Sequence, residues 1–262
     1  MQVRNYGRLS MISKSQISFI KSLHQKKIRK EQGLFIVEGL KSFAEFIHSD
    51  YIIDSIFHTE DVMPKLGNLL QNVKVYEISK SDLSKISSLT SPQQLLALIK
   101  IPQSKELTTK LLKGSFTLAL DGIQDPGNLG TIIRTADWFG IKHIICSEDT
   151  VDLYNSKVIQ ATMGSLSRVQ LSYTNLETFL KNTDLPVYGA VLNGNSVYEI
   201  NFRNEGILVL GNEGSGIRPE IINIIKYPVM IPRFGKAESL NVAISASIFC
   251  SELRRNSRKF VG

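Results

Sequence analysis

The sequence is poor in cysteine and contains no long hydrophobic run. Its two cysteines, Cys146 and Cys250, lack metal-ligand spacing and are too few for a disulfide framework, so we expect no bound metal. No stretch approaches the roughly 18 apolar residues that a membrane span needs. Near the amino terminus Arg4, Arg8 and Lys14 have no apolar block between them, so we expect no secretory signal. These absences exclude a membrane protein and a disulfide-rich secreted domain, and they predict a cytoplasmic protein.

The composition is that of a chain that folds around a hydrophobic core. Apolar residues make up 42% of the sequence, charged residues 21%, and glycine and proline together 26 of 262 residues. Such values exclude a disordered protein, a collagen-like fibre and a low-complexity linker. The length fits one large domain or two modest ones.

Positive charge is concentrated in the first part of the chain. Residues 1–113 hold 17 Lys+Arg and 10 Asp+Glu, a net charge of +7, whereas residues 114–262 hold 14 of each. A concentrated positive field attracts polyanions through counterion release. The asymmetry suggests a nucleic-acid partner for the first part, with a basic surface that only aids solubility as the alternative.

The first part alternates between helical and strand patterns. Residues 13–32 predict one helix with Ser13 as its N-cap and Gly33 as its stop. Further strands are expected over 33–39, 51–58, 73–78 and 94–101, and further helices over 39–49, 61–70 and 79–89. This alternation predicts a small α/β domain over residues 1–105, followed by a polar, lysine-rich linker over residues 106–114.

The second part, residues 115–262, predicts a largely parallel sheet. Apolar strand patterns occur at 116–120, 143–146, 187–192, 207–210 and 228–231. Helical patterns occur at 129–139, 155–164 and 238–255. Continuous apolar strands with intervening helices favour a parallel sheet that is covered on both faces. Ligands of such sheets bind beyond the carboxyl ends of the strands, so the loops that follow the strands are the candidate sites.

The loop after the first of these strands carries Asn128 and Arg134. Pro126 and Gly127 predict a tight turn, and Asn128 can cap a helix that begins at Leu129. Arg134 falls in the first turns of that helix, near the strand ends. A helix cap and a solvated arginine would explain both residues in any α/β protein.

The loop over residues 211–217, GNEGSGI, is rich in glycine. Three glycines in six positions let the backbone pass close to a ligand and expose its N–H groups. No Gly-Lys-Ser/Thr follows, and the spacing is G-x-x-G-x-G, so neither the Walker loop nor the dinucleotide-binding pattern is present. A plain structural turn explains a lone loop of this kind equally well.

A third loop, over residues 231–241, leads into the last predicted helix. Ser239 and Asn241 place polar groups at the start of that helix, which continues with small residues. Helix capping alone would account for Ser239 and Asn241.

Together the three loops resemble the motifs of a known family. Asn128 with Arg134, the run GNEGSG from residue 211, and IP with SLNVA over residues 231–243 resemble the three motifs of the SpoU (TrmH-like) family of the SPOUT superfamily. The match keeps the order and the spacing over residues 115–255. KKIRKEQGLFIVEG, residues 26–39, is similar to the family's N-terminal RNA-binding domain. The resemblance implies an S-adenosylmethionine-dependent RNA ribose 2′-O-methyltransferase.

The same resemblance implies a fold and partners. The fold would be an α/β knot, with a deep trefoil knot and a mainly parallel sheet in the C-terminal domain and a small N-terminal α/β RNA-binding domain. The protein would be a homodimer whose active site is completed across the interface. Its substrate would be RNA, with ribosomal RNA favoured over transfer RNA, and neither DNA nor a membrane is expected as a partner.

The resemblance also implies roles for individual residues. The expected cofactor-binding residues are Gly211, Asn212, Gly216, Ile231 and Leu240. The expected catalytic residues are Asn128, Arg134, Glu213, Ser239 and Asn241. The expected RNA-binding residues are Lys26, Lys27, Arg29 and Lys30. None of the four histidines lies in a motif, so we expect no histidine base, and Arg134 would instead bind the target phosphate and stabilise the developing alkoxide.

Other functions stay open on the sequence alone. A transfer-RNA ribose methyltransferase would carry the same motifs. A catalytically silent RNA-binding SPOUT protein would need a broken Arg134, Ser239 or Asn241, and all three residues are present. An enzyme that methylates a base nitrogen is disfavoured by the Ser-Leu-Asn run, and another type of nucleotide-binding α/β protein is disfavoured because both phosphate-loop patterns fail.

Overall fold

The computed structural model describes residues 12–59, 62, 73–103 and 107–256, and the chain divides into two units. Unit 1 comprises residues 1–103 and 154–167, and unit 2 comprises residues 104–153 and 168–262. The sequence analysis assigned residues 154–167 to the second domain, whereas in the structure they pack with unit 1. The helix expected over residues 61–70 lies outside the described residues except at Val62.

Unit 1 is built on a four-stranded sheet. Its strands are β1 (Leu34–Glu38), β2 (Ile53–His58), β3 (Lys74–Glu77) and β4 (Leu95–Lys100). The spatial order is β1-β4-β2-β3, with β4 antiparallel to both of its neighbours and β2 parallel to β3. The helices are α1 (Lys14–Ser22), α2 (Lys26–Gln32), α3 (Leu40–Ile47), α5 (Lys80–Ile86), α8 (Ser156–Thr162) and the short 3-10 helix η3 (Ser165–Ser167).

The single helix predicted over residues 13–32 is wrong, because the structure has two helices there, α1 and α2. The chain turns at Leu23, whose side chain is buried in the core of unit 1. The two predicted ends are confirmed. Ser13 and Gln16 form a reciprocal capping box at the start of α1, and Gly33 ends α2 in the left-handed conformation, with φ +62°.

An aromatic cluster joins the segment before α8 to the sheet of unit 1. The rings of Tyr154 and Phe35 lie 4.7 Å apart between centroids, and Phe46 and Tyr51 pack edge to face at 5.0 Å. Burial raises the pKa of Tyr51 to about 12. The neutral phenol is therefore the form that fits this core.

Unit 2 is built on a six-stranded parallel sheet. Its strands are β5 (Phe116–Asp121), β6 (His143–Ser147), β7 (Gln170–Thr174), β8 (Val187–Ser196), β9 (Gly206–Gly211) and β10 (Tyr227–Met230), in the order β10-β8-β9-β5-β6-β7. The helices are α6 (Thr109–Leu112), α7 (Pro126–Trp138), α9 (Leu176–Lys181), α10 (Pro219–Ile222) and α11 (Val242–Asn256).

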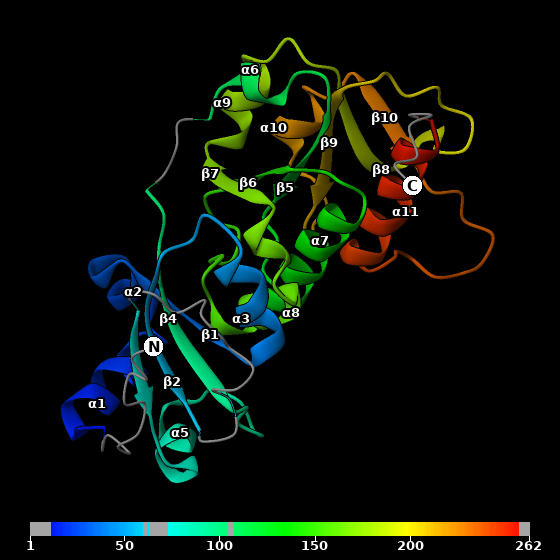
Figure 1. Ribbon diagram of the computed structural model, residues 1–262. Coiled ribbons are helices and arrows are strands. Elements are labelled where there is room, and N and C mark those ends of the chain that lie inside the picture. Colours follow the sequence, from blue (N-terminus) through cyan, green and yellow to red (C-terminus); the bar gives the residue numbers. More distant parts are fainter. Residues whose placement is uncertain (1–11, 60–61, 63–72, 104–106, 257–262) are drawn as a thin grey trace. The chain divides into compact units, whose positions relative to one another are not determined.

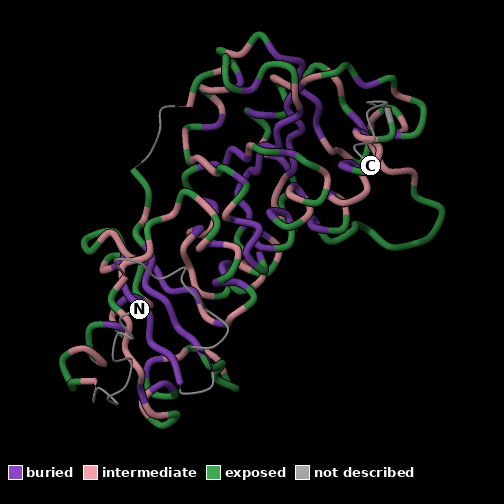
Figure 2. The backbone as a smooth tube through the Cα atoms, in the orientation of Figure 1, coloured by how far each residue is buried: buried purple, intermediate pink, exposed green. Residues whose placement is uncertain are grey.

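Helices cover both faces of this sheet. Along the central strand β5 alternate side chains point to opposite faces, and all six of its residues are buried. On one face α9 and α10 pack together, and on the other face α7 packs against α11 (Figure 1). Figure 2 shows how burial concentrates on the strands of this unit. The sheet has the layered, parallel construction that the sequence predicted.

The short helices α6, α9 and α10 were not predicted, and α6 lies within the predicted linker. Strand β7 was not predicted, because it is an edge strand with no fully buried residue and so has no apolar run. Helix α11 begins at Val242 rather than at residue 238, which leaves residues 231–241 as a long loop. In the part of the chain that the structure describes, no helix is long and apolar enough to span a bilayer.

Candidate active site

Three loops that follow strands of unit 2 carry the predicted site residues. Strands β5 and β9 are adjacent and parallel, and Asp121 and Gly211 are register partners at their carboxyl ends. The loop after β5 leads into α7, the loop after β9 spans residues 212–218, and the loop after β10 spans residues 231–241. This edge of the sheet is the one at which open α/β proteins bind ligands.

The first loop ends at a helix cap made by Asp125. The Asp125 side chain accepts a hydrogen bond from the backbone N–H of Asn128 at 2.7 Å, and α7 begins at Pro126. The prediction that Asn128 caps a helix beginning at Leu129 is therefore wrong. Because Asp125 supplies the cap, the carboxamide of Asn128 is left to bond to the other loops.

The glycine-rich loop is a closed turn. The Asn212 N–H donates to the Gly216 carbonyl at 2.9 Å, and the Gly216 N–H donates to the Asn212 carbonyl at 3.0 Å. The Asn212 side chain also donates to the carbonyl of Gly122 at 2.8 Å, which ties the turn to the loop after β5. A Cβ atom on Gly211 would lie only 2.2 Å from the carbonyl carbon of Gly216. The turn therefore requires glycine at position 211 for its close approach.

An ion pair fastens the far end of this loop to β5. The Arg218 N–H donates to Asp121 Oδ2 at 2.8 Å, and Arg218 Nε donates to Oδ1 at 2.7 Å. Asp121 is only 1% exposed, so removing Arg218 would leave a buried carboxyl group without its partner. Hydrogen bonding to Asp121 raises the pKa of Arg218. The sequence analysis missed this pair, for which the single signal was an acidic residue at the end of an apolar strand.

Asn128 joins the other two loops through its side chain. Asn128 Nδ2 donates to Glu213 Oε1 at 2.7 Å, and Asn128 Oδ1 accepts from Asn241 Nδ2 at 2.9 Å. Asn241 Oδ1 in turn accepts from the backbone N–H of Ala243 at 2.9 Å, at the start of α11. We call Asn128, Glu213 and Asn241 the amide cluster. Residues that are 85 and 113 positions from Asn128 thus meet it in one chain of hydrogen bonds.

Arg134 and Ser239 are exposed residues outside the amide cluster. Arg134 lies on α7, and among the described residues none forms a hydrogen bond or ion pair with its side chain. Ser239 lies on the loop before α11 and not in the helix. The structure therefore brings together three of the five predicted catalytic residues and leaves the other two available to a ligand.

A pocket of about 970 Å³ opens beside the second and third loops. It is lined by all five predicted cofactor-binding residues, Gly211, Asn212, Gly216, Ile231 and Leu240. Glu213 and Ser239 line it too, and Phe249 contributes to its apolar wall. Small-molecule sites have volumes of about 300–1,000 Å³, mostly apolar walls and a few polar groups. The pocket has room for a nucleoside-sized cofactor, and it is lined by the glycine-rich loop and by apolar side chains.

Comparison with known proteins identifies the family. A model described as SpoU rRNA Methylase family matches residues 115–251, more than half of the chain. The chain belongs to the SpoU family. A model described as MRM3-like substrate binding domain matches residues 14–97. The family predicted from the three loops is confirmed.

Relatives of this SpoU chain match it over nearly its full length. The 23S rRNA (guanosine(2553)-2′-O)-methyltransferase RlmP of Bacillus subtilis is 33% identical, with 89% of this chain and 94% of RlmP covered. The structure of a TrmH-family protein from Porphyromonas gingivalis is 40% identical, with a TM-score of 0.86 and 95% and 100% of the two chains covered. An AdoMet-bound rRNA methyltransferase from Sinorhizobium meliloti is 29% identical, with a TM-score of 0.83 and 95% and 97% covered. The predicted α/β fold is confirmed.

The predicted RNA-binding residues of this SpoU protein lie on or beside α2 in unit 1. Lys26, Lys27 and Lys30 are exposed. Arg29 is only 4% exposed, and its Nη1 donates to the carbonyls of Leu23 at 2.9 Å and His24 at 2.8 Å. The structure corrects the prediction at this residue: Arg29 satisfies carbonyls at the end of α1 instead of facing solvent.

Proposed function

We propose that this protein methylates a ribose 2′-hydroxyl of ribosomal RNA, with S-adenosylmethionine as the methyl donor. The observation that carries the proposal is the amide cluster beside a pocket that is lined by every predicted cofactor residue, in a chain of the SpoU family. The methyltransferase class and the cofactor follow from the family and from the AdoMet-bound relative.

The pocket residues suit S-adenosylmethionine. Ile231 and Leu240 offer apolar surfaces for the adenine, while Gly211 and Gly216 line the pocket without a side chain. When bound, the cofactor supplies an electrophilic methyl group. Asn212 is already committed to holding the turn through its bond to Gly122, so its role toward the cofactor is to keep the backbone in place.

The remaining residues act on the RNA. A ribose hydroxyl is a weak nucleophile, so the site must stabilise the negative charge that develops on its oxygen. Arg134 binds the neighbouring phosphate and stabilises this charge, because its planar guanidinium presents several N–H donors and has no partner among the described residues. Ser239, at the pocket margin, orients the hydroxyl. The amide cluster positions the three loops, and holding the reactants in place contributes much of the rate.

Ribosomal RNA is the favoured substrate. RlmP acts on 23S ribosomal RNA, and the Sinorhizobium relative is also named an rRNA methyltransferase. An enzyme that modifies ribosomal RNA meets its substrate in the cytoplasm. Residues 1–105 would act as the RNA-binding domain, through exposed lysines such as Lys26, Lys27 and Lys30.

We also propose the trefoil knot and the homodimer that the resemblance implies. The two loops that would form the knot, residues 211–218 and 231–241, line the same pocket. Helices α7 and α11 pack together and carry exposed apolar side chains, Trp138 and Ile244, that suit a subunit interface. Sedimentation should give a mass near twice 29.3 kDa, whereas a stable and active monomer would contradict the shared active site.

Mass mapping of nucleosides tests the activity. RNA from a strain that lacks the gene should have lost one 2′-O-methylated nucleoside in ribosomal RNA, and adding the purified protein with S-adenosylmethionine should restore it. If the methyl group is lost from transfer RNA instead, transfer RNA is the substrate and ribosomal RNA is not. Loss from a base nitrogen, or no loss at all, would refute ribose methylation.

A further inference from the structure

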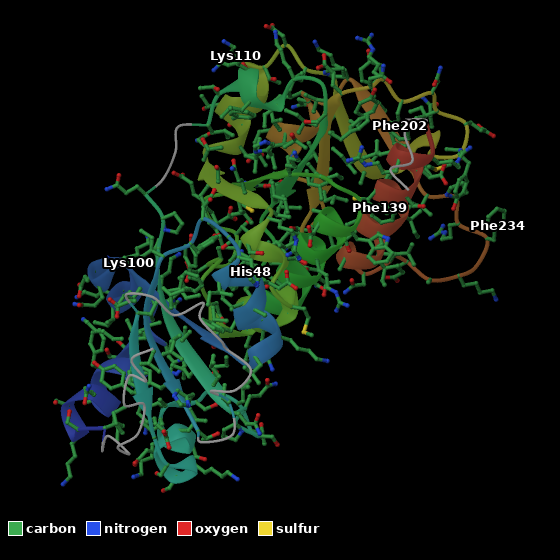
Figure 3. All side chains as sticks on the ribbon, viewed as in Figure 1. His48, Lys100, Lys110, Phe139, Phe202 and Phe234 are labelled. Atoms are coloured by element: carbon green, nitrogen blue, oxygen red, sulfur yellow. The ribbon has the colours of Figure 1, made fainter. Side chains whose placement is uncertain are left out.

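Phe234 has the most exposed large apolar side chain among the described residues. It is 97% exposed and lies on the long loop between β10 and α11 (Figure 3). Isolated apolar residues on a surface are common and usually need no explanation. Phe234, however, contributes to the lining of the pocket, and it precedes Ser239 by only five positions. Its ring is therefore exposed at the margin of the proposed active site.

The neighbours of Phe234 are cationic. Arg233 and Lys236 are both exposed on the same loop, and Arg233 Nη1 donates to the carbonyl of Ala237 at 3.3 Å, which holds the guanidinium over the loop. Glu238 is the acidic residue of this segment. The loop therefore combines an aromatic ring with two neighbouring cations. The ring suits the flat base of a nucleotide, and the cations suit its charged phosphate.

We propose that Phe234 stacks on an unpaired base of the RNA substrate next to the ribose that is methylated, while Arg233 and Lys236 contact the adjoining phosphates. The inference rests on the proposed function, because it places the RNA chain at this pocket. Proteins recognise single-stranded RNA by stacking unpaired bases on aromatic side chains and by electrostatic contacts to the backbone.

Two other occupants fit the loop less well. The cofactor already has apolar walls in Ile231 and Leu240, and a cationic margin offers nothing to an electrophilic sulfonium. A second copy of the chain would bury Lys236 together with Phe234, whereas lysine is depleted at protein–protein interfaces. Charge complementarity therefore favours RNA.

Substitution of Phe234 tests the stacking role. Single-turnover methylation is measured with ribosomal RNA from a strain that lacks the gene, at saturating S-adenosylmethionine. Stacking on one base contributes an effect of roughly 5- to 150-fold, so F234A should raise the half-saturating RNA concentration by that factor. F234W should restore wild-type behaviour, and F234L should not, because leucine has no π face. Tyr198, exposed outside the pocket, is the matched control, and Y198A should leave the RNA dependence unchanged.

Fluorescence gives a second readout that does not depend on activity. The chain has one tryptophan, Trp138, so the W138F/F234W protein carries its single indole at the proposed stacking position. Stacking on a base should quench its emission when this ribosomal RNA is added. S-adenosylmethionine alone should leave the emission unchanged.

The outcomes separate this inference from the proposed function. If the wild-type protein does not methylate the RNA, the proposed function fails. If the wild type methylates the RNA and F234A does so with an unchanged RNA dependence, only the stacking role is refuted. A weaker affinity of F234A for S-adenosylmethionine with normal RNA dependence would make Phe234 a cofactor residue. A lower sedimentation mass for F234A than for the wild type would make it an interface residue. Either result overturns the stacking role.

Discussion

In unit 1 the charges that suit RNA are exposed lysines on a short helix, whereas in unit 2 the polar groups of the site are amides and a carboxylate held by hydrogen bonds. Lys26 and Lys30 need only a favourable field, which tolerates imprecise positions. Asn128 and Glu213, in contrast, meet at 2.7 Å across two loops. Affinity for a polyanion and catalysis therefore make different demands on structure. Changes in unit 1 should therefore act on RNA binding, and changes in unit 2 on the rate.

The largest effect is expected from Arg134. R134A should fold and bind S-adenosylmethionine with near-normal affinity, because the side chain has no partner among the described residues and is not part of the pocket lining. Methyl transfer should fall by roughly 10²–10³, the scale for losing one preorganised charge-stabilising donor. Single-turnover methylation at saturating cofactor measures this loss.

R134K is the control for charge at this position. One ammonium does not reproduce the planar fork that a guanidinium presents to phosphate oxygens, so R134K should recover little of the rate. A loss of less than about threefold in R134A would identify Arg134 as an ordinary solvated helix residue.

A smaller effect on the same step is expected from Asn128. N128A removes both side-chain bonds of the amide cluster, so the loops that carry Glu213 and Asn241 lose their common partner. We expect the rate at saturating RNA to fall by roughly 10- to 100-fold, because small misplacements of catalytic groups are costly. N175A removes another asparagine of unit 2, the N-cap of α9, and should lower stability but not the rate. Equal rates for N128A and N175A would contradict a positioning role.

The exposed lysines of unit 1 should affect binding alone. A triple K26Q/K27Q/K30Q protein should bind ribosomal RNA roughly tenfold more weakly at moderate salt, and the slope of log affinity against log salt should fall by about 2–3. The maximal rate should not change. The matched control removes three exposed lysines of unit 2, in K113Q/K142Q/K226Q. If both triple variants lose the same affinity, the net charge of the chain matters and unit 1 has no special part.

The smallest effect concerns stability at high pH and the aromatic cluster of unit 1. Tyr51 has a pKa of about 12 in the folded protein against an ordinary value of 10.0, so above pH 10 the unfolded chain releases the proton first. The free energy of unfolding should therefore be unaffected by this group below pH 10 and should fall by up to roughly 2 kcal/mol as the pH approaches 12. Urea titrations of wild type and Y51F at pH 9 and pH 11 measure the difference. A wild type that loses no more stability than Y51F between these pH values would contradict the assignment.

The sequence predicted features that depend on neighbouring residues or on long apolar runs. The capping box at Ser13, the helix stop at Gly33 and the central strands β5 and β9 are all encoded within a few positions. Edge strand β7 was not predicted because none of its residues is fully buried, so no run of apolar residues marks it in the sequence. The break after α1 was missed because neither glycine nor proline marks it in the sequence.

The candidate site was predicted in its residues but not in its contacts. The resemblance named Asn128, Glu213 and Asn241, while the bonds that unite them join positions far apart in the chain. The pairing of Asp121 with Arg218, 97 positions away, had one weak local signal, an acidic residue at the end of an apolar strand, and nothing that pointed to its partner. Local patterns specify helix ends and strands, whereas long-range polar partners depend on the finished fold.

The close packing of Gly211 against Gly216 limits which residues position 211 can accept during evolution. Any side chain at position 211 would collide with the backbone of Gly216. The main chain therefore lines the pocket at this position, and a substitution of Gly211 cannot adjust the shape of the pocket there. The loop from Arg233 to Glu238 is exposed and free of such constraints. Sequence changes in this pocket are therefore expected to accumulate in the exposed loop and not at Gly211, so that related proteins would differ in the loop that we propose contacts RNA.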